Sequence, residues 1–339
     1  MVMPMNAEAA GPQSGMKQSQ HKVIFTVTTA GNDFYSAMTR LSVASLRLSN
    51  PGLYVMIACD NDSVCAMHRA CDPLLGEVDE CLSFETPAGN AISRNRFVKT
   101  SLGSLIDGPF LSLDSDILVR GDLSGIFLLD CDIAGARNHS REAFAEQVWD
   151  QDRLTLDAMA WEVRCDVYVN GGVLFFNDTI AARRLSATWH ELWLKSSGCQ
   201  GHCRDQPALN AALHMVKPRL TVLPDDCNAQ FRVSPATARD ARIWHYYSFE
   251  NATPHTLFER QVRKLLHGNP LCEDQVAAMI RQSHPWRRFT LLDDLAAARI
   301  MRRNRFDGWE GAWLRRERWQ YLRGMVNDLP ALVKRAVTQ

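Results

Sequence analysis

Two carboxylates one residue apart, Asp114 and Asp116, are the side chains of this sequence most able to do chemistry. They follow the apolar run 110–113 and precede a second apolar run, 117–119, so they lie where a buried strand ends. Burying unpaired carboxylates costs several kcal/mol unless a cation or a basic partner compensates. Oxygen ligands at this spacing suit Mg²⁺ or Mn²⁺, which complete their shell with water and substrate phosphates. The pair predicts a metal site for a phosphate-bearing substrate, although acidic triplets also occur in turns and helix caps.

The first half of the chain alternates between strand and helix patterns that would position this pair. Strands are predicted at 23–28, 54–58, 81–84 and 110–113, and helices at 34–48, 63–70 and 94–106. Such alternation predicts a parallel sheet with Rossmann-like winding. Binding sites in these sheets open at the carboxyl ends of the strands, where Thr28, Asp60 and Asp114 fall.

The second half has a less regular pattern. Extended segments are predicted at 132–136, 166–177 and 243–247, and helices at 141–161, 180–195 and 205–214. Paired glycines, Gly171 and Gly172, interrupt the strand 166–177, which indicates a bulge, the close approach of a backbone or ligand, or a bend that serves packing alone. Asp205 could simply be the N-cap of the helix that contains Pro207.

Composition excludes several classes of protein. The 339 residues, 46% hydrophobic and 22% charged with a net charge of zero, are typical of a globular protein and give no general basis for binding nucleic acid. Ten scattered cysteines fit a reducing cytoplasm better than a secreted disulfide scaffold. The segment from Cys199 to Cys203 is interpreted as a polar loop rather than half of a zinc site. No apolar run approaches the ~20 residues of a membrane span.

Five motifs in order resemble glycosyltransferase family 8, which includes glycogenin and bacterial lipopolysaccharide galactosyl- and glucosyltransferases. The motifs are Thr28-Thr29-Ala30, Lys99 before Asp114-Ser115-Asp116, Asn170-Gly171-Gly172-Val173 with Phe176-Asn177, Asp205-Gln206, and Trp244-His245-Tyr246. The resemblance covers roughly residues 21–250. It implies an α/β GT-A fold, a Rossmann-like mixed sheet with helices on both faces, over residues 21–255. A disordered tail, 1–20, would precede this domain and a basic helical region, 256–339, would follow it.

The resemblance also implies roles for individual residues. Asp114, Asp116 and His245 would bind Mn²⁺ or Mg²⁺, although an isolated histidine on an apolar strand is commonly a hydrogen-bonded core residue. Thr28, Thr29 and Ala30 would contact base and ribose, bordered by Asp33 or Tyr35, and Ser115 would belong to the donor site. Lys99 would approach the phosphates, while Asn170, Asp205 and Gln206 would flank the sugar. The implied activity is retaining transfer of a hexose, most simply from a UDP-sugar, to a saccharide or glycolipid acceptor in lipopolysaccharide or cell-surface polysaccharide synthesis.

One departure from the family affects the catalytic assignment more than the fold. The family continues after its metal-binding histidine with a glycine and then Lys-Pro-Trp, whereas residues 245–255 here contain neither. Arg260 or Lys264 could replace that lysine, turnover could be slow, or the chain could belong to a divergent bacterial branch with another donor.

The C-terminal stretch 281–339 is strongly basic, with 13 Lys and Arg against 6 Asp and Glu and with four tryptophans among them. Basic amphipathic helices with interfacial tryptophans are attracted to anionic headgroups, so this region predicts peripheral docking on the inner face of the plasma membrane. The alternative is a helical cap on the core with its arginines in solvent.

Two rival functions remain open at this point. The run 110–118 also resembles the nucleophile strand of a haloacid dehalogenase-like phosphatase, in which Asp114 would be the nucleophile. The chain could also be a non-catalytic nucleotide-sugar or glycan binder, because the sequence after His245 departs from the family.

Overall fold

The computed structural model describes residues 21–140, 143–163, 166–231, 235–238, 240–246, 256–282 and 285. The predicted tail 1–20, the segment 247–255 and nearly all of the basic stretch 281–339 lie outside the described residues.

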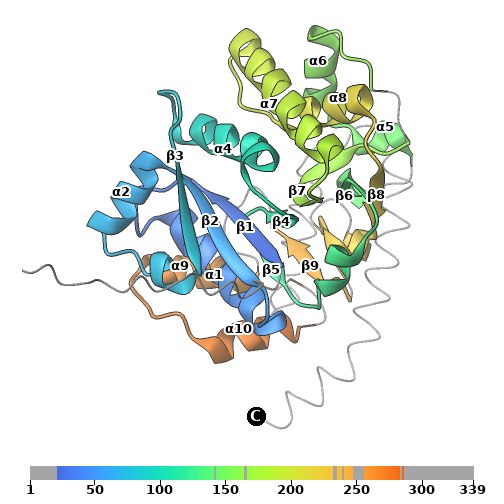
Figure 1. The fold of residues 1–339 in the computed structure, drawn as a ribbon. Helices are drawn as coiled ribbons and strands as arrows, with labels where there is room; N and C mark the ends of the chain where they lie inside the picture. Colours follow the sequence, from blue (N-terminus) through green and yellow to red (C-terminus); the bar gives the residue numbers. More distant parts are fainter. Residues whose placement is uncertain are drawn as a thin grey trace, which may run out of the picture.

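A seven-stranded sheet in the order β3-β2-β1-β4-β7-β6-β8 forms the centre of the molecule (Figure 1). Its strands are β1 (Lys22–Val27), β2 (Tyr54–Asp60), β3 (Glu80–Phe84), β4 (Phe110–Leu113), β6 (Ile133–Arg137), β7 (Val169–Phe176) and β8 (Leu220–Leu223). β7 runs antiparallel to both of its neighbours, and all other pairs are parallel. The predicted α/β class, with a Rossmann-like mixed sheet and helices on both of its faces, is confirmed.

Helices cover both faces of this sheet, which is why β1, β2 and β4 are almost continuously buried. α4, α7 and α8 pack together on one face, whereas α1, with α9 and α10 against it, lies on the other (Figure 1). The α-helices are α1 (Phe34–Ser49), α2 (Asn61–Arg69), α3 (Leu74–Glu77), α4 (Ala91–Leu105), α5 (Phe144–Gln147), α6 (Asp150–Ala158), α7 (Ile180–Gln200), α8 (Gln206–Val216), α9 (Leu257–Leu266) and α10 (Glu273–Ile280). Short 3₁₀ turns are η1 (Ser124–Leu128), η2 (Asn138–Ser140), η3 (Asp225–Cys227) and η4 (Pro235–Ala238).

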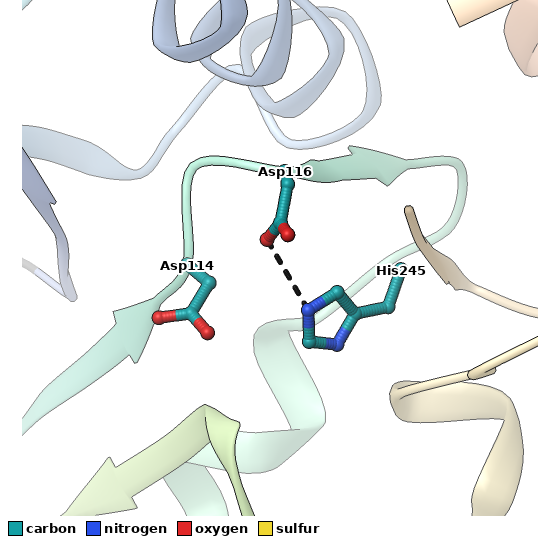
Figure 2. Close-up of side chains that lie close together, drawn as sticks. All are labelled: Asp114, Asp116 and His245. Atoms are coloured by element: carbon teal, nitrogen blue, oxygen red, sulfur yellow. Dashed lines mark ion pairs between the residues drawn. The ribbon is translucent and has the colours of Figure 1, made fainter. Parts of the chain in front are cut away.

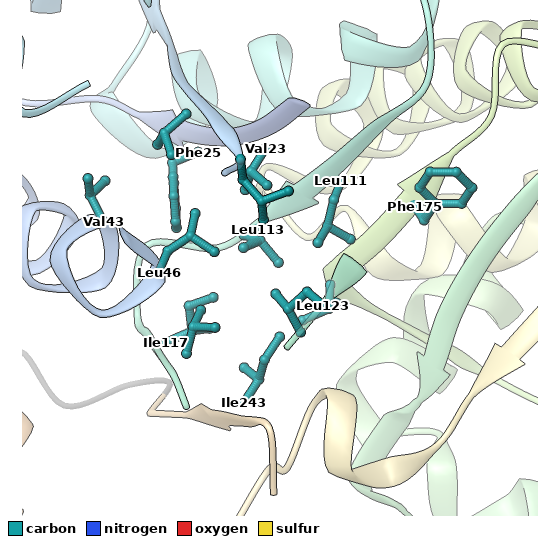
Figure 3. Packing of buried hydrophobic residues seen from close by; sticks show 14 of the residues in the cluster. Val23, Phe25, Val43, Leu46, Leu111, Leu113, Ile117, Leu123, Phe175 and Ile243 are labelled. Carbon is teal, nitrogen blue, oxygen red and sulfur yellow. The ribbon is translucent and has the colours of Figure 1, made fainter. Parts of the chain in front are cut away.

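Side-chain alternation along β1 divides the core between the two faces. Phe25 and Val27 pack with Val43 and Leu46 of α1 in the cluster shown in Figure 3, whereas Ile24 belongs to the cluster beneath α4 and α7. The even-numbered positions of β1 therefore face α4.

A second, two-stranded sheet joins β5 (Ile117–Val119) to β9 (Ile243–His245) in antiparallel register. Sequence reasoning did not predict this pairing, because strands of three residues carry almost no periodic signal. It places the segment that follows the Asp114–Asp116 turn directly beside the strand that ends in His245.

The C-terminal helices are attached to the same strand. The Phe258 ring of α9 stacks on Tyr246 with ring centroids 4.3 Å apart. The Arg120 guanidinium lies 3.7 Å from the Trp244 ring centroid and donates to the carbonyl oxygens of Ala241 at 2.8 Å and Ile280 at 3.1 Å. α9 and α10 thereby support the strand that carries His245.

Several predicted elements differ in detail. The helix predicted over 141–161 consists of two short helices, α5 and α6, because Val148 and Trp149 adopt extended backbone between them. β7 contains Gly171 and Gly172, and its register against β6 shifts there: Gly135 pairs with Leu174 but Arg137 pairs with Val169, so the paired glycines lie in the irregular stretch, as the bulge alternative predicted. β8 was not predicted.

All nine cysteines in the described part of the chain are free thiols. His202, in the segment interpreted as a loop, hydrogen-bonds the Thr155 hydroxyl at 3.0 Å. None of the helices within the described ranges has both the length and the apolar character that crossing a bilayer requires.

Candidate active site

The turn between β4 and β5 presents Asp114 and Asp116 to His245 (Figure 2). The β5–β9 register pairs Ile117 with His245, so the histidine ring projects toward the turn. Asp116 Oδ1 lies 3.2 Å from His245 Nε2, and one ligand atom from each of the three residues lies within 4.8 Å of the others. Within the described ranges, this is the one group of three or more His, Cys, Asp or Glu side chains with such spacing. The three residues named from the resemblance are therefore brought together.

Hydrogen bonds from the β7 backbone determine which ring nitrogen of His245 faces the carboxylates. The Gly172 N–H donates to Asn170 Oδ1 at 2.9 Å, and Asn228 Nδ2 donates to the same oxygen at 2.9 Å. Asn228 Oδ1 must then face His245 Nδ1, at 2.8 Å, and since a carboxamide oxygen only accepts, the proton is on Nδ1. Nε2 is left for Asp116 or for a metal ion, which is how metal-binding histidines are usually oriented.

The contact between His245 and Asp116 shifts the pKa of each group. Burial alone would lower the pKa of His245, but the Asp116 carboxylate outweighs burial and the pKa lies above its usual value. Burial likewise would raise the pKa of Asp116, but the His245 ring outweighs it and the pKa lies below its usual value. The side chains present fit a divalent cation that accepts two carboxylate oxygens and one imidazole nitrogen and leaves positions for water or phosphate.

Two basic residues of α4 contact carboxylates of the site: Lys99 lies between Asp114 and Asp205, and Arg96 lies beside Asp205. The Lys99 ammonium is 2.5 Å from Asp114 Oδ1 and 3.7 Å from Asp205 Oδ2, and its side chain is 4% exposed. Arg96 Nε is 3.2 Å from Asp205 Oδ1, and Asp205 is the main cause of a raised Arg96 pKa. Asp205 makes no capping hydrogen bond at the start of α8, so its side chain belongs to the site rather than to the helix end.

Asn170 and Gln206 meet at the amino end of β7. Gln206 Oε1 accepts from Asn170 Nδ2 at 3.1 Å and from the Gly171 N–H at 3.3 Å. Gln206 Nε2 donates to Asp152 Oδ2 at 3.4 Å. Because β7 is antiparallel to β4, its amino end lies at the carboxyl edge of the sheet beside Asp114, whose N–H donates to the Gly172 carbonyl oxygen at 2.9 Å.

Two cavities meet at this cluster. The smaller, about 240 Å³, is bordered by Thr26, Thr28 and Tyr35 and by the first turns of α4. The larger, about 770 Å³, contains Lys99, Asn170, Asp205, Gln206 and His245 in its walls. Asp114 and Asp116 belong to both linings, so the carboxylate pair lies at the junction.

Only some of the residues expected to contact the base and ribose line a cavity. Thr28 and Ser115 line the smaller cavity. The Thr29 hydroxyl and the Ala30 N–H instead donate to the Asp33 carboxylate at 2.7 and 2.8 Å, and Asp33 also caps α1. Of the two residues expected to border this pocket, Tyr35 lines it.

The segment in which the sequence departs from the family after His245, residues 247–255, lies outside the described residues. Arg260 and Lys264 are exposed on α9, and neither lines the two cavities.

Sequence reasoning missed several polar residues of the site. Asn228 is fully buried beside His245, and Asp152, on α6, has a nearly buried carboxylate in the wall of the larger cavity. Trp149, 43% exposed, lies in the same wall with its ring 5.1 Å from the ring of His139. An isolated polar or aromatic residue, whether in a turn as Asn228 and Trp149 are or on a helix as Asp152 is, looks like any other surface residue, so the sequence offered no signal for them.

The sequence matches no model of a known protein family and no curated protein. Among solved structures, the chain is similar to galactosyltransferase LgtC in complex with donor and acceptor sugar analogs, at 14% identity and a TM-score of 0.49, over 75% of this chain and 98% of that one. It is also similar to mouse xyloside xylosyltransferase 1, at 15% identity and a TM-score of 0.44, over 69% and 99% of the two chains. A third is glycosyltransferase GlyE of Streptococcus pneumoniae TIGR4, at 16% identity and a TM-score of 0.49, over 80% and 66%. Structural similarity at such low sequence identity does not identify a substrate or an activity, so both are argued from the residues of the site.

Proposed function

We propose that this protein is a metal-dependent, retaining glycosyltransferase that moves a hexose from a nucleotide sugar, in the first place a UDP-sugar, to a saccharide acceptor. The observation that carries the proposal is the Asp114–Asp116–His245 cluster at the junction of two cavities. A nucleoside diphosphate sugar has this same arrangement, with a base and ribose, a charged diphosphate in the middle, and a sugar beyond it.

The two cavities suit different parts of such a donor. The smaller one, between the end of β1 and the start of α4, is proposed to hold the nucleoside, with Thr28 and Tyr35 in its wall. The larger one is proposed to hold the hexose against Asn170, Asp205 and Gln206.

In the proposed reaction the bond between the anomeric carbon and the β-phosphate oxygen breaks, and the nucleoside diphosphate leaves with the electron pair. The acceptor hydroxyl oxygen bonds to the anomeric carbon, and its proton passes to the released phosphate. Lys99 and Arg96 are placed to stabilise the negative charge that develops on the leaving group. A divalent ion such as Mn²⁺, held by Asp114, Asp116 and His245, would add to that stabilisation.

The acceptor is proposed to enter the larger cavity where Trp149 and His139 line it, since the partly exposed indole offers an apolar face to a saccharide ring. A glycolipid acceptor in lipopolysaccharide or cell-surface polysaccharide synthesis, reached from the inner face of the plasma membrane, remains part of the proposal through the basic stretch 281–339. Nearly all of that stretch lies outside the described residues.

The proposal is tested by calorimetric titration of UDP in the presence of Mn²⁺ and again with EDTA. Binding should require Mn²⁺, and Asp114→Asn should weaken it by at least about tenfold, because a ligand charge is lost. The matched control is Asp107→Asn, at the opposite end of β4 with its side chain 96% exposed, which should bind as wild type. A panel of UDP-sugars then identifies the hexose. Absence of UDP binding in both buffers, or hydrolysis of simple phosphate monoesters by the wild type, would contradict the proposal.

A further inference from the structure

Asp152 is a carboxylate in the larger cavity with a side chain only 5% exposed. Its Oδ2 accepts from the Tyr168 hydroxyl at 3.1 Å and from Gln206 Nε2 at 3.4 Å, and its Oδ1 lies 3.6 Å from Arg204 Nη1. A buried ionised carboxylate is costly and is kept only where its partners compensate or where it has a role. Neither the metal cluster nor the proposed donor contacts account for it.

The hydrogen bonds around Gln206 show which end of its carboxamide faces the Asp152 carboxylate. Two donors, Asn170 Nδ2 and the Gly171 N–H, face Gln206 Oε1, so the amide nitrogen must face Asp152. Asp152 therefore contacts the amide nitrogen of Gln206, whereas Oε1 faces Asn170 and Gly171 at the start of β7, in the wall of the larger cavity.

We propose that Asp152 is a positioning residue that holds the Gln206 carboxamide in this orientation and polarises it, so that Oε1 carries additional negative charge toward the proposed sugar site. A charged acceptor on an amide N–H withdraws the hydrogen and shifts electron density to the amide oxygen, and such polarisation along hydrogen-bond chains is strongest where water is excluded. Positive charge develops on the sugar as a glycosidic bond breaks, and Oε1 would stabilise it. The inference rests on the proposed transfer reaction.

The ionisation of Asp152 makes this role sensitive to pH. Burial raises the pKa of Asp152 to about 6, opposed by the Tyr168 hydroxyl and the Arg204 charge, while Asp205 adds to the rise. Besides these three groups, His202 faces α6 through the Thr155 hydroxyl. Below pH 6 the neutral carboxyl polarises Gln206 far less, so the contribution should be present at neutral pH and lost in acid.

Asp152→Asn provides an isosteric test, because its amide oxygen can accept from both Tyr168 and Gln206 while the charge is removed. The readout is UDP released from UDP-glucose and UDP-galactose by slow hydrolysis in Mn²⁺ buffer. The variant should lower kcat about tenfold, with KM within about twofold of wild type, since only the transition state carries the extra charge. Wild-type kcat should fall below about pH 6, and the Asp152→Asn profile should lack that fall. Asp157→Asn, an exposed position on the same helix, should match wild type throughout.

A second measurement does not depend on turnover. With ¹⁵N-glutamine labelling, the side-chain NH₂ resonances of Gln206, assigned by their loss in Gln206→Glu, should shift with a midpoint near pH 6 in the wild type and not in Asp152→Asn. Unshifted resonances in the wild type, or a normal kcat in Asp152→Asn when Gln206→Ala is impaired, would overturn the inference. Failure of the wild type to bind UDP or release it from either sugar would instead overturn the proposed function, and the resonance titration would still decide the contact.

Discussion

At the scale of single residues, one backbone hydrogen bond has consequences across the whole site. The Gly172 N–H selects the oxygen of Asn170, and through it the orientation of Asn228 and the tautomer of His245. On the other side, the Gly171 N–H selects the oxygen of Gln206. Two consecutive peptide groups of β7 thus orient side chains of both the proposed metal site and the proposed sugar site.

Asn228→Ala tests the first of these chains. Removing its oxygen frees His245 Nδ1 and lets the ring change tautomer, so Mn²⁺ affinity should fall by about ten- to a hundredfold, as for other lost partners of metal-binding histidines. Isothermal titration of Mn²⁺ measures this change.

The matched control is Asn50→Ala, another buried amide, which donates to the Gly121 carbonyl at 3.0 Å and accepts from the Leu123 N–H at 2.8 Å. Both variants should lose about 1–3 kcal/mol of unfolding free energy, since each leaves a buried group unpaired. Only the Asn228 variant should lose Mn²⁺ affinity, and equal affinities in the two would contradict the tautomer argument.

At the scale of elements, β7 can approach the β5–β9 pair closely because Gly172 has no side chain. A Cβ at this position would clash with Cε1 of His245 and lie 3.0 Å from Asn170 Oδ1. The paired glycines that interrupt an apolar strand pattern therefore mark the close approach of the His245 side chain, which was not among the alternatives drawn from the sequence.

Gly172→Ala should displace His245 and destabilise the fold by about 1–3 kcal/mol, the usual cost of overpacking. Gly198→Ala provides the contrast, because nothing lies within 4 Å of a Cβ there and the position is inside α7. Alanine should stabilise that helix by up to about 1 kcal/mol. Urea unfolding of both variants, together with Mn²⁺ titration, measures the difference, and a neutral Gly172→Ala would show that the strand can move away from the ring.

At the scale of the whole molecule, the stability of the fold should depend on pH through Asp152. The pKa of this group is raised to about 6 in the folded protein, above the value near 3.9 of an unfolded chain. Its contribution to folding is therefore fully present below about pH 4 and is lost as pH rises through 6, a change of about 3 kcal/mol.

Asp152→Asn removes this titration. Relative to wild type, the variant should gain about 2 kcal/mol between pH 4.5 and pH 8 in urea unfolding, because part of the total change has already occurred at pH 4.5, whereas Asp157→Asn should show no such trend. A difference between variant and wild type that is the same at both pH values would contradict the buried, titrating carboxylate. Together with the kinetic test, this would show Asp152 contributing to the site at a cost in stability.

The sequence by itself determined the alternation of strands and helices, and with it the α/β fold, because local periodicity reports which side of each element is buried. It also identified the Asp114–Asp116 pair, since two carboxylates after an apolar run are recognisable without neighbours. Only the tertiary structure decided that Asp205 faces Arg96 and Lys99 instead of capping α8. It alone also showed which polar residues surround the cluster: Asn228 behind His245, and Asp152 behind Gln206. These contacts join segments far apart in the chain through strands of three or four residues and irregular turns, and such segments have no periodicity from which their partners could be inferred.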